Sequence, residues 1–375
     1  MKIVHLLWGL ATGGIENMLV DIVNQQVEGN EISLIVINNM LDESIQARLD
    51  KRIHIYCCDR KVKSKNPLPI LKLNYFLRKI RPDIVHAHYD EMAKFVFGKW
   101  TMVRTIHNTT NDFDESKYFK ACYAISKAVQ EEWMQAGKES ILVENGIPCD
   151  SINCEKTGLF NDGLLHFVQV SRLYIKQKGQ DILLKALAEI KNNNLCKINF
   201  KMHFVGDGSG RELLQNMTKT LGIEDLVLFE GNKPRKWIYE NLCNFDLFIQ
   251  PSRYEGFGLT VAEAMVAKVP VLSSNIEGPV EIMSVVKDGA KQLLGYTFES
   301  ENPEDLARQI AAFVQQGRYE ENIEFGRQHV MRNYSIKKTA LQYLDEYRKV
   351  IAYRRLSIQS IRWLIQLLSE STASS

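Results

Sequence analysis

Short apolar runs rich in β-branched residues alternate with amphipathic stretches along nearly the whole chain. Five strands are expected in the first part, at Ile3–Leu7, Ser33–Ile37, Ile84–His88, Val103–His107 and Ile141–Glu144. Five more follow, at His166–Ser171, Ile198–Val205, Leu226–Phe229, Asp246–Gln250 and Pro270–Ser273. Helical periodicity fills the intervals, as at Ile15–Val27, Ile70–Lys79, Asp181–Lys191, Arg211–Leu221 and Glu304–Gln315. Strands that are apolar at almost every position are typical of parallel sheets covered on both faces, so the fold class is α/β.

The 375 residues exceed what one hydrophobic core usually organises, so two domains are expected. The stretch Asp150–Gly163 holds glycine and asparagine and lacks apolar periodicity, which indicates a linker. We therefore expect two doubly wound halves, at residues 1–155 and 156–335, with residues 336–375 remaining at the C-terminus.

The composition, 45% hydrophobic and 25% charged, is that of a soluble globular protein and excludes collagen-like and disordered classes. No run reaches the roughly 18 apolar residues that a bilayer span needs, and the N-terminus predicts a first strand and not a signal peptide. Seven cysteines without a C-x-x-C pair give no sign of a zinc ribbon or a redox motif. A cytoplasmic protein is the expectation.

In doubly wound sheets, ligands bind beyond the carboxyl ends of the strands, so the loops that follow strands are the candidate binding sites. The first loop ends in Gly13-Gly14-Ile-Glu16, where glycines allow close backbone approach and a helix start offers N–H groups to an anion. It lacks the G-x-G-x-x-G spacing of a dinucleotide site, which argues against a nicotinamide-dependent oxidoreductase, and a tight turn without a ligand explains it equally well. In the second loop, Arg172 and Lys178 could converge on one phosphate, unless both are simply solvated.

A third loop, Gly206-Asp-Gly208-Ser-Gly210, could cradle a phosphate or merely make room for a nucleoside. The fourth loop follows a buried strand and leads into a helix that begins near Leu259. Glu255 would lie in the turn and Glu263 about one turn inside the helix, where it could accept hydrogen bonds from a ribose. The N–H groups of Phe257, Gly258 and Leu259 would point toward an anion.

Taken together, these residues resemble the retaining glycosyltransferases of family 4, which have the two-domain GT-B fold. The segment Glu255-Gly-Phe-Gly-Leu-Thr-Val-Ala-Glu263 matches the family's E-x7-E motif. Three further matches are Ser171-Arg172 with Lys178-Gly179-Gln-Asp181, Gly13-Gly14-Ile-Glu16, and Asn145-Gly146-Ile147. The resemblance covers roughly residues 1–350, and Pro148 departs from it where many members have an acid.

The resemblance implies two Rossmann-like domains facing a central cleft, with a C-terminal helix in residues 336–375 that crosses back to the first domain. Arg172 and Lys178 would neutralise the diphosphate of a nucleotide sugar, Glu255 would contact the sugar and Glu263 the ribose. The donor-binding set would also include Gly13, Gly14, Gly256, Phe257, Gly258 and Leu259. His107 would touch the donor sugar, and Glu16 would belong to the acceptor side or to its loop.

These assignments imply a retaining hexosyltransferase with a donor that is most simply UDP-linked. Because fixed cations can stabilise the leaving diphosphate, neither a metal nor another cofactor is expected. The D-x-D sequence Asp112-Phe-Asp114, a pattern of metal-dependent enzymes, lies in a polar loop and carries little weight. Same-face attack and a covalent intermediate both stay open.

The net charge of +2 conceals a basic segment, Lys51–Arg81, with ten basic residues and one acid. That segment therefore has a charge of +9 and the rest of the chain −7. Its helix around Ile70–Ile80 is either a surface for an anionic membrane or a helix packed on the sheet with a solvated basic rim. The acceptor is accordingly expected to be a glycan, in particular a lipid-linked saccharide in cell-surface polysaccharide or lipopolysaccharide assembly, and no nucleic-acid module is present.

Three alternatives accompany this interpretation. The chain could be a non-catalytic, membrane-associated homologue with a vestigial donor site. His86-Ala-His88 with His107 would permit a metal site, although ordinary polar strand ends are the simpler interpretation. The tail Tyr353–Leu368 is either the returning helix of the family or a second membrane-contacting helix.

Overall fold

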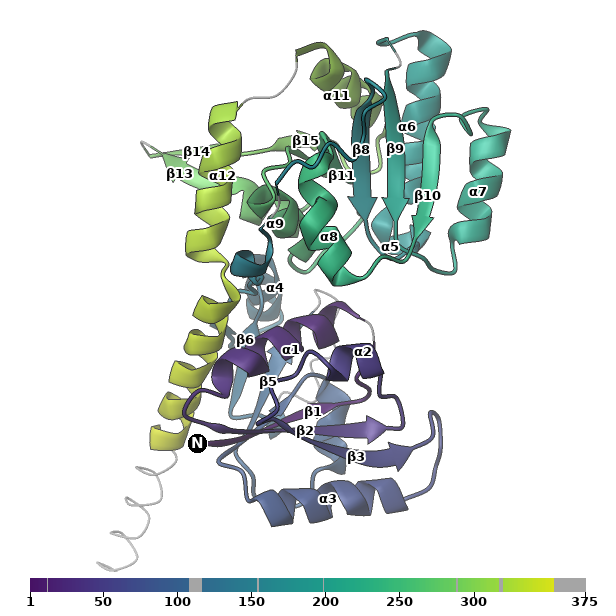
Figure 1. Cartoon of the computed structure of the whole chain (residues 1–375). Helices are drawn as coiled ribbons and strands as arrows, with labels where there is room; N and C mark the ends of the chain where they lie inside the picture. The colour runs from purple at the N-terminus through teal and green to yellow at the C-terminus, as the bar shows by residue number, and fades with distance from the viewer. Residues whose placement is uncertain are drawn as a thin grey trace, which may run out of the picture. The chain divides into compact units, whose positions relative to one another are not determined.

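The computed structural model describes residues 1–353, apart from 12, 108–116, 154, 198, 288 and 317–319. The chain forms two compact units. The first comprises Met1–Glu144 and the chain from Ile336 onward, and the second comprises Asn145–Ser335 (Figure 1). Asp112, Asp114 and most of the tail lie outside the described residues.

The first unit is built on a seven-stranded parallel sheet with the order β3-β2-β1-β4-β5-β6-β7. The strands are β1 (Lys2–Leu7), β2 (Glu31–Asn38), β3 (His54–Arg60), β4 (Ile84–Ala87), β5 (Met102–Ile106), β6 (Ala121–Ala124) and β7 (Ile141–Leu142). The order reverses between β1 and β4, and a doubly wound sheet binds its ligands at such a switch point.

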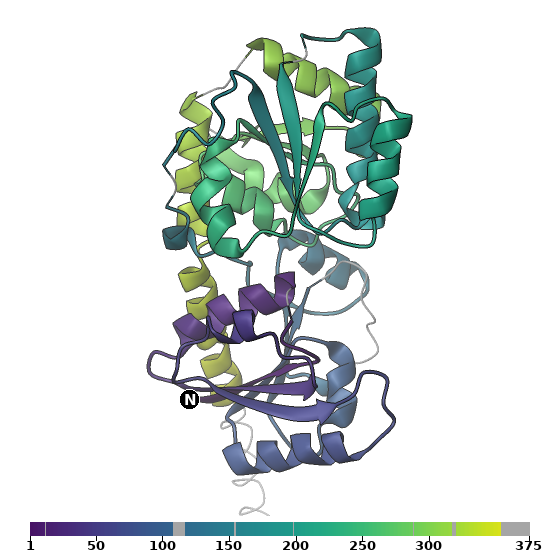
Figure 2. The same cartoon turned by 45° about the vertical axis from the view of Figure 1, so that its right-hand side comes forward.

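Helices cover both faces of this sheet, which explains why its central strands are buried and mostly apolar. They are α1 (Gly14–Gln26), α2 (Glu43–Gln46), α3 (Leu68–Ile80) and α4 (Lys127–Gln135), with the 3₁₀ turn η1 (Asp90–Phe95). α1 and α3 lie on opposite faces of the sheet, as both views show (Figures 1 and 2). Leu73 and Leu77 of α3 are fully buried in the core beneath β2 and β3.

The second unit has a six-stranded parallel sheet with the order β10-β9-β8-β11-β12-β15. Its strands are β8 (Leu165–Val170), β9 (Phe200–Val205), β10 (Val227–Gly231), β11 (Leu247–Gln250), β12 (Val271–Ser274) and β15 (Tyr296–Phe298). An antiparallel hairpin of β13 (Ser284–Lys287) and β14 (Ala290–Leu293) stands apart from it. The switch point of this sheet lies between β8 and β11.

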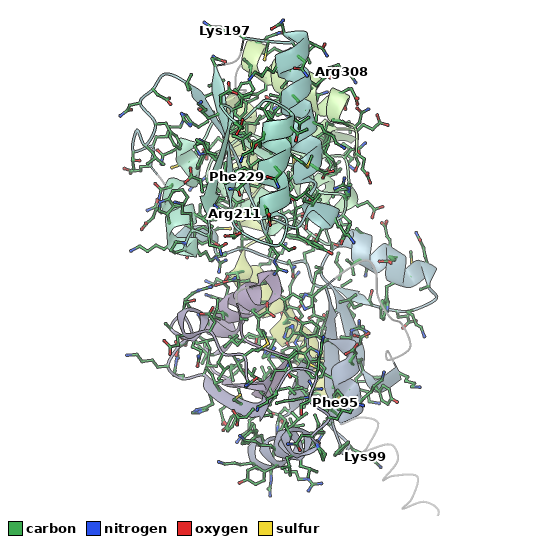
Figure 3. The ribbon with its side chains drawn as sticks, turned by 90° about the vertical axis from the view of Figure 1, so that its right-hand side faces the viewer. Phe95, Lys99, Lys197, Arg211, Phe229 and Arg308 are labelled. Atoms are coloured by element: carbon green, nitrogen blue, oxygen red, sulfur yellow. The ribbon has the colours of Figure 1, made fainter. Side chains whose placement is uncertain are left out.

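The helices of the second unit follow its strands in the expected alternation. They are α5 (Ile175–Lys178), α6 (Gln180–Asn193), α7 (Arg211–Thr220), α8 (Arg235–Asn241), α9 (Leu259–Val266), α10 (Glu277–Met283), α11 (Pro303–Gln316) and α12 (Glu320–Asn333). The 3₁₀ turns η3 (Cys149–Ser151) and η4 (Leu242–Asn244) complete the unit. Figure 3 shows the side chains of this unit, with Arg211 at the start of α7 and Phe229 of β10 labelled.

A helix at residues 336–353 returns the chain to the first unit, as expected. Its Tyr343 and Tyr347 are fully buried there. The hydroxyl of Tyr343 lies 2.9 Å from Oγ1 of Thr105, and that of Tyr347 lies 2.5 Å from Nδ1 of His86. The passage into the second unit occurs at Glu144–Asn145, ahead of the boundary expected at residue 155.

The predicted α/β class with two doubly wound parallel sheets is confirmed. Sequence periodicity did not predict β3, β6 and β15 of the two parallel sheets, nor the two strands of the hairpin, β13 and β14. β3 is an edge strand with only one buried residue, Cys58, and β6 and β15 are four and three residues long. Short strands and exposed edge strands give a weaker sequence signal than long buried ones. Within the described part of the chain, no helix combines the length and apolar content needed to cross a membrane.

Candidate functional site

The loops that follow β8 and β11 meet at the switch point of the second unit. β8 pairs directly with β11 in parallel, so the carboxyl ends of both strands open onto one edge of the sheet. The first loop carries Arg172 and Lys178, and the second carries Glu255. Segments almost eighty residues apart in sequence thus supply side chains to one place.

Glu255 is held by three donors on a single oxygen. Its Oε1 lies 2.5 Å from Nζ of Lys178 and accepts hydrogen bonds of 2.8 Å from Nε2 of Gln250 and Oγ of Ser252. The side chains of Lys178 and Glu255 are only 19% and 9% exposed, so solvent screens this ion pair weakly. The arrangement fixes the carboxylate and directs its other oxygen away from these three donors.

Arg172 stands at the end of β8 with an exposed side chain. Among the described residues, its guanidinium makes no hydrogen bond or ion pair. The backbone around it is held firmly, because Nε2 of the buried Gln180 donates to the carbonyl of Arg172 at 3.0 Å and to Oγ of Ser171 at 3.1 Å. Gln169 likewise donates to the carbonyl of Lys178 at 3.1 Å. These hydrogen bonds hold the backbone of the loop in place. Of its two cationic side chains, Lys178 is paired with Glu255 and Arg172 faces solvent.

The two loops are locked together by a close backbone approach and an ion pair. Gly179 has φ +63°, and a Cβ there would lie 1.8 Å from the carbonyl oxygen of Pro251, so only glycine fits. Arg253 binds both carboxylate oxygens of Asp181, each at 2.9 Å, and the carbonyl of Ile175 at 2.7 Å. Burial raises the pKa of Asp181, but hydrogen bonds and charge from Arg253 outweigh it and lower that pKa overall.

The glycine-rich loop after β9 packs against the loop after β8. Cβ atoms at Gly206 and Gly208 would lie 2.0 Å from the carbonyl oxygen of Ser171 and 2.6 Å from that of Leu173. Gly210 donates its N–H to the same Leu173 carbonyl at 2.9 Å. These glycines therefore make room for the backbone that carries Arg172.

The loop after β11 leads into α9 through Gly258, which caps the helix with φ +109° and offers no side chain to its N–H groups. Phe257 is buried, and its ring packs edge-on against Tyr334 at 5.4 Å between centroids. Phe257 therefore contributes its backbone to this turn while its ring belongs to the core. Gly256 completes the turn, and Leu259 is the first residue of α9.

Glu263 lies on α9 and is held from α8. Its Oε1 accepts a hydrogen bond of 2.8 Å from the hydroxyl of Tyr239 and lies 3.8 Å from a guanidinium nitrogen of Arg235. The side chain is 12% exposed, so the carboxylate is largely buried and lies close to the positive charge of Arg235. Neither Arg235 nor Tyr239 carries a motif in the sequence.

Gly13, Gly14, Glu16 and His107 belong to the first unit, at the carboxyl ends of β1 and β5. Gly13 caps α1, and a Cβ on it would meet only the flexible end of Glu16. Gly14 has open space around it. Oε1 of Glu16 lies 3.3 Å from the hydroxyl of Tyr89, whose pKa rises through burial.

His107 ends a row of hydrogen-bonded histidines. Its Nε2 lies 3.3 Å from Nδ1 of His88, and Nε2 of His88 lies 3.1 Å from Nδ1 of His5. Burial lowers the pKa of His107 to about 3, and the charge of Arg104 acts in the same direction. Burial also lowers the pKa of His5 to about 4, although the hydrogen bond from His5 to Gln26 opposes this.

One group of histidines could in principle hold a metal ion within the described residues, namely His5, His86 and His88, whose nitrogens lie within 4.8 Å of one another. Both nitrogens of His86 are already bonded, to Tyr347 at 2.5 Å and to Thr105 at 2.7 Å. The pKa of His86 and that of His88 lie well below the usual value through burial. The group is neutral and internally hydrogen-bonded.

The helix α3 has two apolar faces. Leu73 and Leu77 face the core, whereas Leu68, Leu71 and Tyr75 are 64%, 55% and 60% exposed. The exposed three recur at intervals of three and four residues and so share one face of the helix. Exposed basic side chains adjoin them, at Lys61, Lys63, Lys65, Arg78 and Lys79. Lys72 is paired with Asp59.

Sequence reasoning passed over the residues that position the site. Gln250, Ser252 and Arg253 precede the E-x7-E segment, yet nothing in their spacing shows that they bind Glu255 and Asp181. The only local signal was Asp181 in the Lys-Gly-x-Asp pattern. His5 had no motif at all, because its partner is 83 residues away.

Comparisons with known proteins agree with this architecture. Residues 150–329 match the family model described as glycosyl transferases group 1. Protein CapJ of Staphylococcus aureus is 25% identical over 227 residues, which are 57% of this chain and 55% of that protein. The poly(ribitol-phosphate) alpha-N-acetylglucosaminyltransferase of S. aureus is 28% identical over 183 residues, 47% of this chain and 34% of that protein. The chain thus spans about a third to a half of the length of these curated relatives.

A solved structure, Anabaena HepE in complex with UDP and glucose, has a TM-score of 0.77 and 18% identity. The match covers 93% of this chain and 100% of that one. Such a likeness concerns the fold, and the match to the group 1 model falls on the unit that contains Lys178, Glu255 and Glu263. The two doubly wound units agree with the GT-B fold of that structure, and residues 150–329 are similar to the family described as glycosyl transferases group 1.

Proposed function

We propose that this chain is a retaining, metal-independent glycosyltransferase of family 4 that moves a hexose from a UDP-linked donor to a glycan acceptor. The observation that carries the proposal is the meeting of the loops after β8 and β11, with Lys178 against Glu255 and Arg172 exposed at the end of β8. HepE, which shares the fold, has been solved with UDP and glucose.

Arg172 and Lys178 would bind the diphosphate. Breaking the bond between sugar and phosphate leaves negative charge on the departing oxygen, and fixed cations lower that barrier. The exposed guanidinium of Arg172 suits a phosphate, and Lys178 keeps two of its three N–H donors when Glu255 takes one. The N–H groups at the start of α9, around Gly258, would add to the positive field.

Glu255 and Glu263 would hold hydroxyl groups. Because Oε1 of Glu255 already receives three hydrogen bonds, its Oε2 is the oxygen suited to a sugar hydroxyl. Three donors, one of them cationic, disperse the charge of the carboxylate, so a positioning role fits Glu255 better than a nucleophilic one. Glu263, held by Tyr239, would accept from the ribose.

Retention is supported by a relative. Sugar nucleotides such as UDP-glucose carry an α-bond to phosphate, and the S. aureus enzyme is named an alpha-N-acetylglucosaminyltransferase. Transfer from an α-linked donor to an α-linked product keeps the configuration at the anomeric carbon. The same stereochemical course is proposed for this chain.

The acceptor is proposed to be a lipid-linked saccharide at the inner face of the cytoplasmic membrane. The support is the second apolar face of α3, where Leu68, Leu71 and Tyr75 are exposed beside several lysines. A helix with exposed apolar residues and adjoining basic side chains binds an anionic bilayer surface through both.

The test begins with calorimetric titration of UDP and a panel of UDP-sugars assayed for hydrolysis and transfer, with and without EDTA. We expect UDP binding, turnover of at least one donor and no loss with EDTA. Binding of UDP without turnover of any donor would favour the non-catalytic homologue with a vestigial site. Loss of activity in EDTA that added Mg²⁺ or Mn²⁺ restores would contradict metal independence.

A further inference from the structure

A continuous row of hydrogen bonds runs through the first unit from α1 to the end of β5. Oε1 of Gln26 lies 3.0 Å from Nε2 of His5, and Nδ1 of His5 lies 3.1 Å from Nε2 of His88. Nδ1 of His88 in turn lies 3.3 Å from Nε2 of His107. Gln26, His5 and His88 are at most 3% exposed, so no water competes for these bonds.

The direction of this row follows from proton counting. A neutral imidazole has one donor and one acceptor nitrogen, and an amide oxygen only accepts. His5 must therefore donate from Nε2 to Gln26, which leaves its Nδ1 as an acceptor. His88 must then donate from Nε2 to His5, and His107 from Nε2 to Nδ1 of His88. The last acceptor left over is Nδ1 of His107.

We propose that Gln26, His5 and His88 are positioning residues that hold His107 as the neutral Nε2–H tautomer and present its Nδ1 as a hydrogen-bond acceptor. The role of His107 rests on the proposed function. In that enzyme, Nδ1 of His107 would accept a hydrogen bond from a hydroxyl of the donor sugar. His107 would then act neither as a cation nor as a proton donor. The assignment of the tautomer itself does not depend on the enzyme activity.

The row also bears on whether these histidines could be charged or could bind a metal ion. Hydrogen bonds engage both nitrogens of His5, His86 and His88. A metal ion would have to displace several of them. Burial keeps the pKa of His5 at about 4 and that of His107 at about 3, so both are uncharged at neutral pH.

The experiment is two-bond ¹⁵N–¹H NMR correlation on protein labelled with ¹⁵N-histidine, with the His107 signals assigned from His107→Gln. We expect a single neutral tautomer at pH 7, protonated at Nε2. A His107 ring protonated at Nδ1, or at both nitrogens, would overturn the proposal, because the row would then run in the opposite direction or be broken. Metal analysis of the purified protein is the second arm, and stoichiometric zinc or another divalent ion would also overturn it.

The variant Gln26→Met removes the amide oxygen that sets the direction, and the matched control Gln25→Met changes the exposed neighbour on α1. We expect His107 to populate both tautomers in the first and to resemble the unmodified protein in the second. An unchanged tautomer in Gln26→Met would remove Gln26 from the proposal. If Gln26→Met does not fold, the spectrum of the unmodified protein still decides.

Kinetics separate this inference from the proposed function. Gln26→Met should raise KM for the donor by about two- to tenfold, the share of one hydrogen bond, and leave UDP affinity unchanged. Absence of any turnover in the unmodified protein would count against the proposed function while the NMR result still tests the tautomer. If Gln26→Met changes the tautomer of His107 but leaves KM for the donor unchanged, the proposed contact between Nδ1 of His107 and the sugar is refuted.

Discussion

Lys178 and Glu255, 77 positions apart, form an ion pair of 2.5 Å at the switch point of the second sheet. The pair couples the loop after β8 to the loop after β11. Gln250 and Ser252 also donate hydrogen bonds to Glu255 and hold its carboxylate in place. In the proposed enzyme, a cation held in this way would need no reorganisation when the diphosphate binds, and fixed charges of this kind lower the barrier to a charged product.

Replacing Lys178 by alanine should lower turnover by about 10²–10³-fold, because one preorganised donor to the leaving group is lost. The measurement is kcat for donor hydrolysis or transfer, with circular dichroism to verify the fold. Lys176→Ala is the matched control, since Lys176 is exposed on the same short helix α5.

Glu263→Ala should abolish transfer, because the carboxylate that would accept hydrogen bonds from the ribose is lost. Near-normal turnover in either Lys178→Ala or Glu263→Ala would remove that residue from the donor site.

Breaking the pair of Arg253 and Asp181 should destabilise the second unit by about 1.5–3 kcal/mol, the usual contribution of hydrogen bonds to charged groups. Arg253→Ala loses both bonds to Asp181 and the bond to the Ile175 carbonyl. Arg253→Lys keeps the charge without the planar fork and should recover only part of the loss. Urea denaturation measures the effect. Equal stability of Arg253→Ala and the unmodified protein would contradict it.

Gly179→Ala should destabilise the second unit by more than the strain of a left-handed backbone angle alone. A Cβ would collide with the Pro251 carbonyl at 1.8 Å, whereas Gly222 has nearly the same φ, +66°, and nothing within 4 Å. Gly222→Ala is therefore the control for left-handed strain, about 1–2 kcal/mol. We expect Gly179→Ala to cost clearly more stability and to weaken UDP binding. Similar losses in both variants would show that the loops can separate without cost.

Acid should destabilise the first unit before its carboxylates titrate. The pKa of His107 is about 3 and that of His5 about 4 in the folded state, against 6.5 for a free histidine. Below pH 6.5 the unfolded chain binds more protons, so the free energy of unfolding falls as the pH falls. Urea midpoints between pH 7.5 and 5 measure this, and His107→Gln should give a shallower decline. An identical slope in that variant would contradict the depressed pKa.

The exposed face of α3 should mediate binding to anionic vesicles. Leu71→Ser removes a side chain that is 55% exposed there, and Leu213→Ser removes one that is 56% exposed on α7 of the other unit. In flotation with vesicles containing phosphatidylglycerol, we expect Leu71→Ser to bind several-fold less and Leu213→Ser to bind normally. Equal binding to neutral and anionic vesicles would exclude the basic segment as the docking surface.

The class of fold was readable in the sequence because it depends on local patterns. Buried parallel strands such as Leu165–Val170 are mostly apolar, and this one is followed by a helix with its own apolar stripe. Short strands such as Ala121–Ala124, with four residues, were not predicted. Lys178 and Glu255 lie in loops that follow strands, where doubly wound sheets bind their ligands, so the sequence alone indicates both as candidate site residues.

The contacts of the candidate site were decided by tertiary structure. Spacing within E-x7-E relates Glu255 to Glu263, but only the pairing of β8 with β11 brings Lys178 to Glu255. The same holds for His5 and His88, which meet because β1 pairs with β4 in register. The periodicity of apolar residues in a segment shows which face of that segment is buried, but not which other segment covers it. Which distant segments become neighbours depends on the order of strands in the sheet, and that order is set by packing of the whole unit.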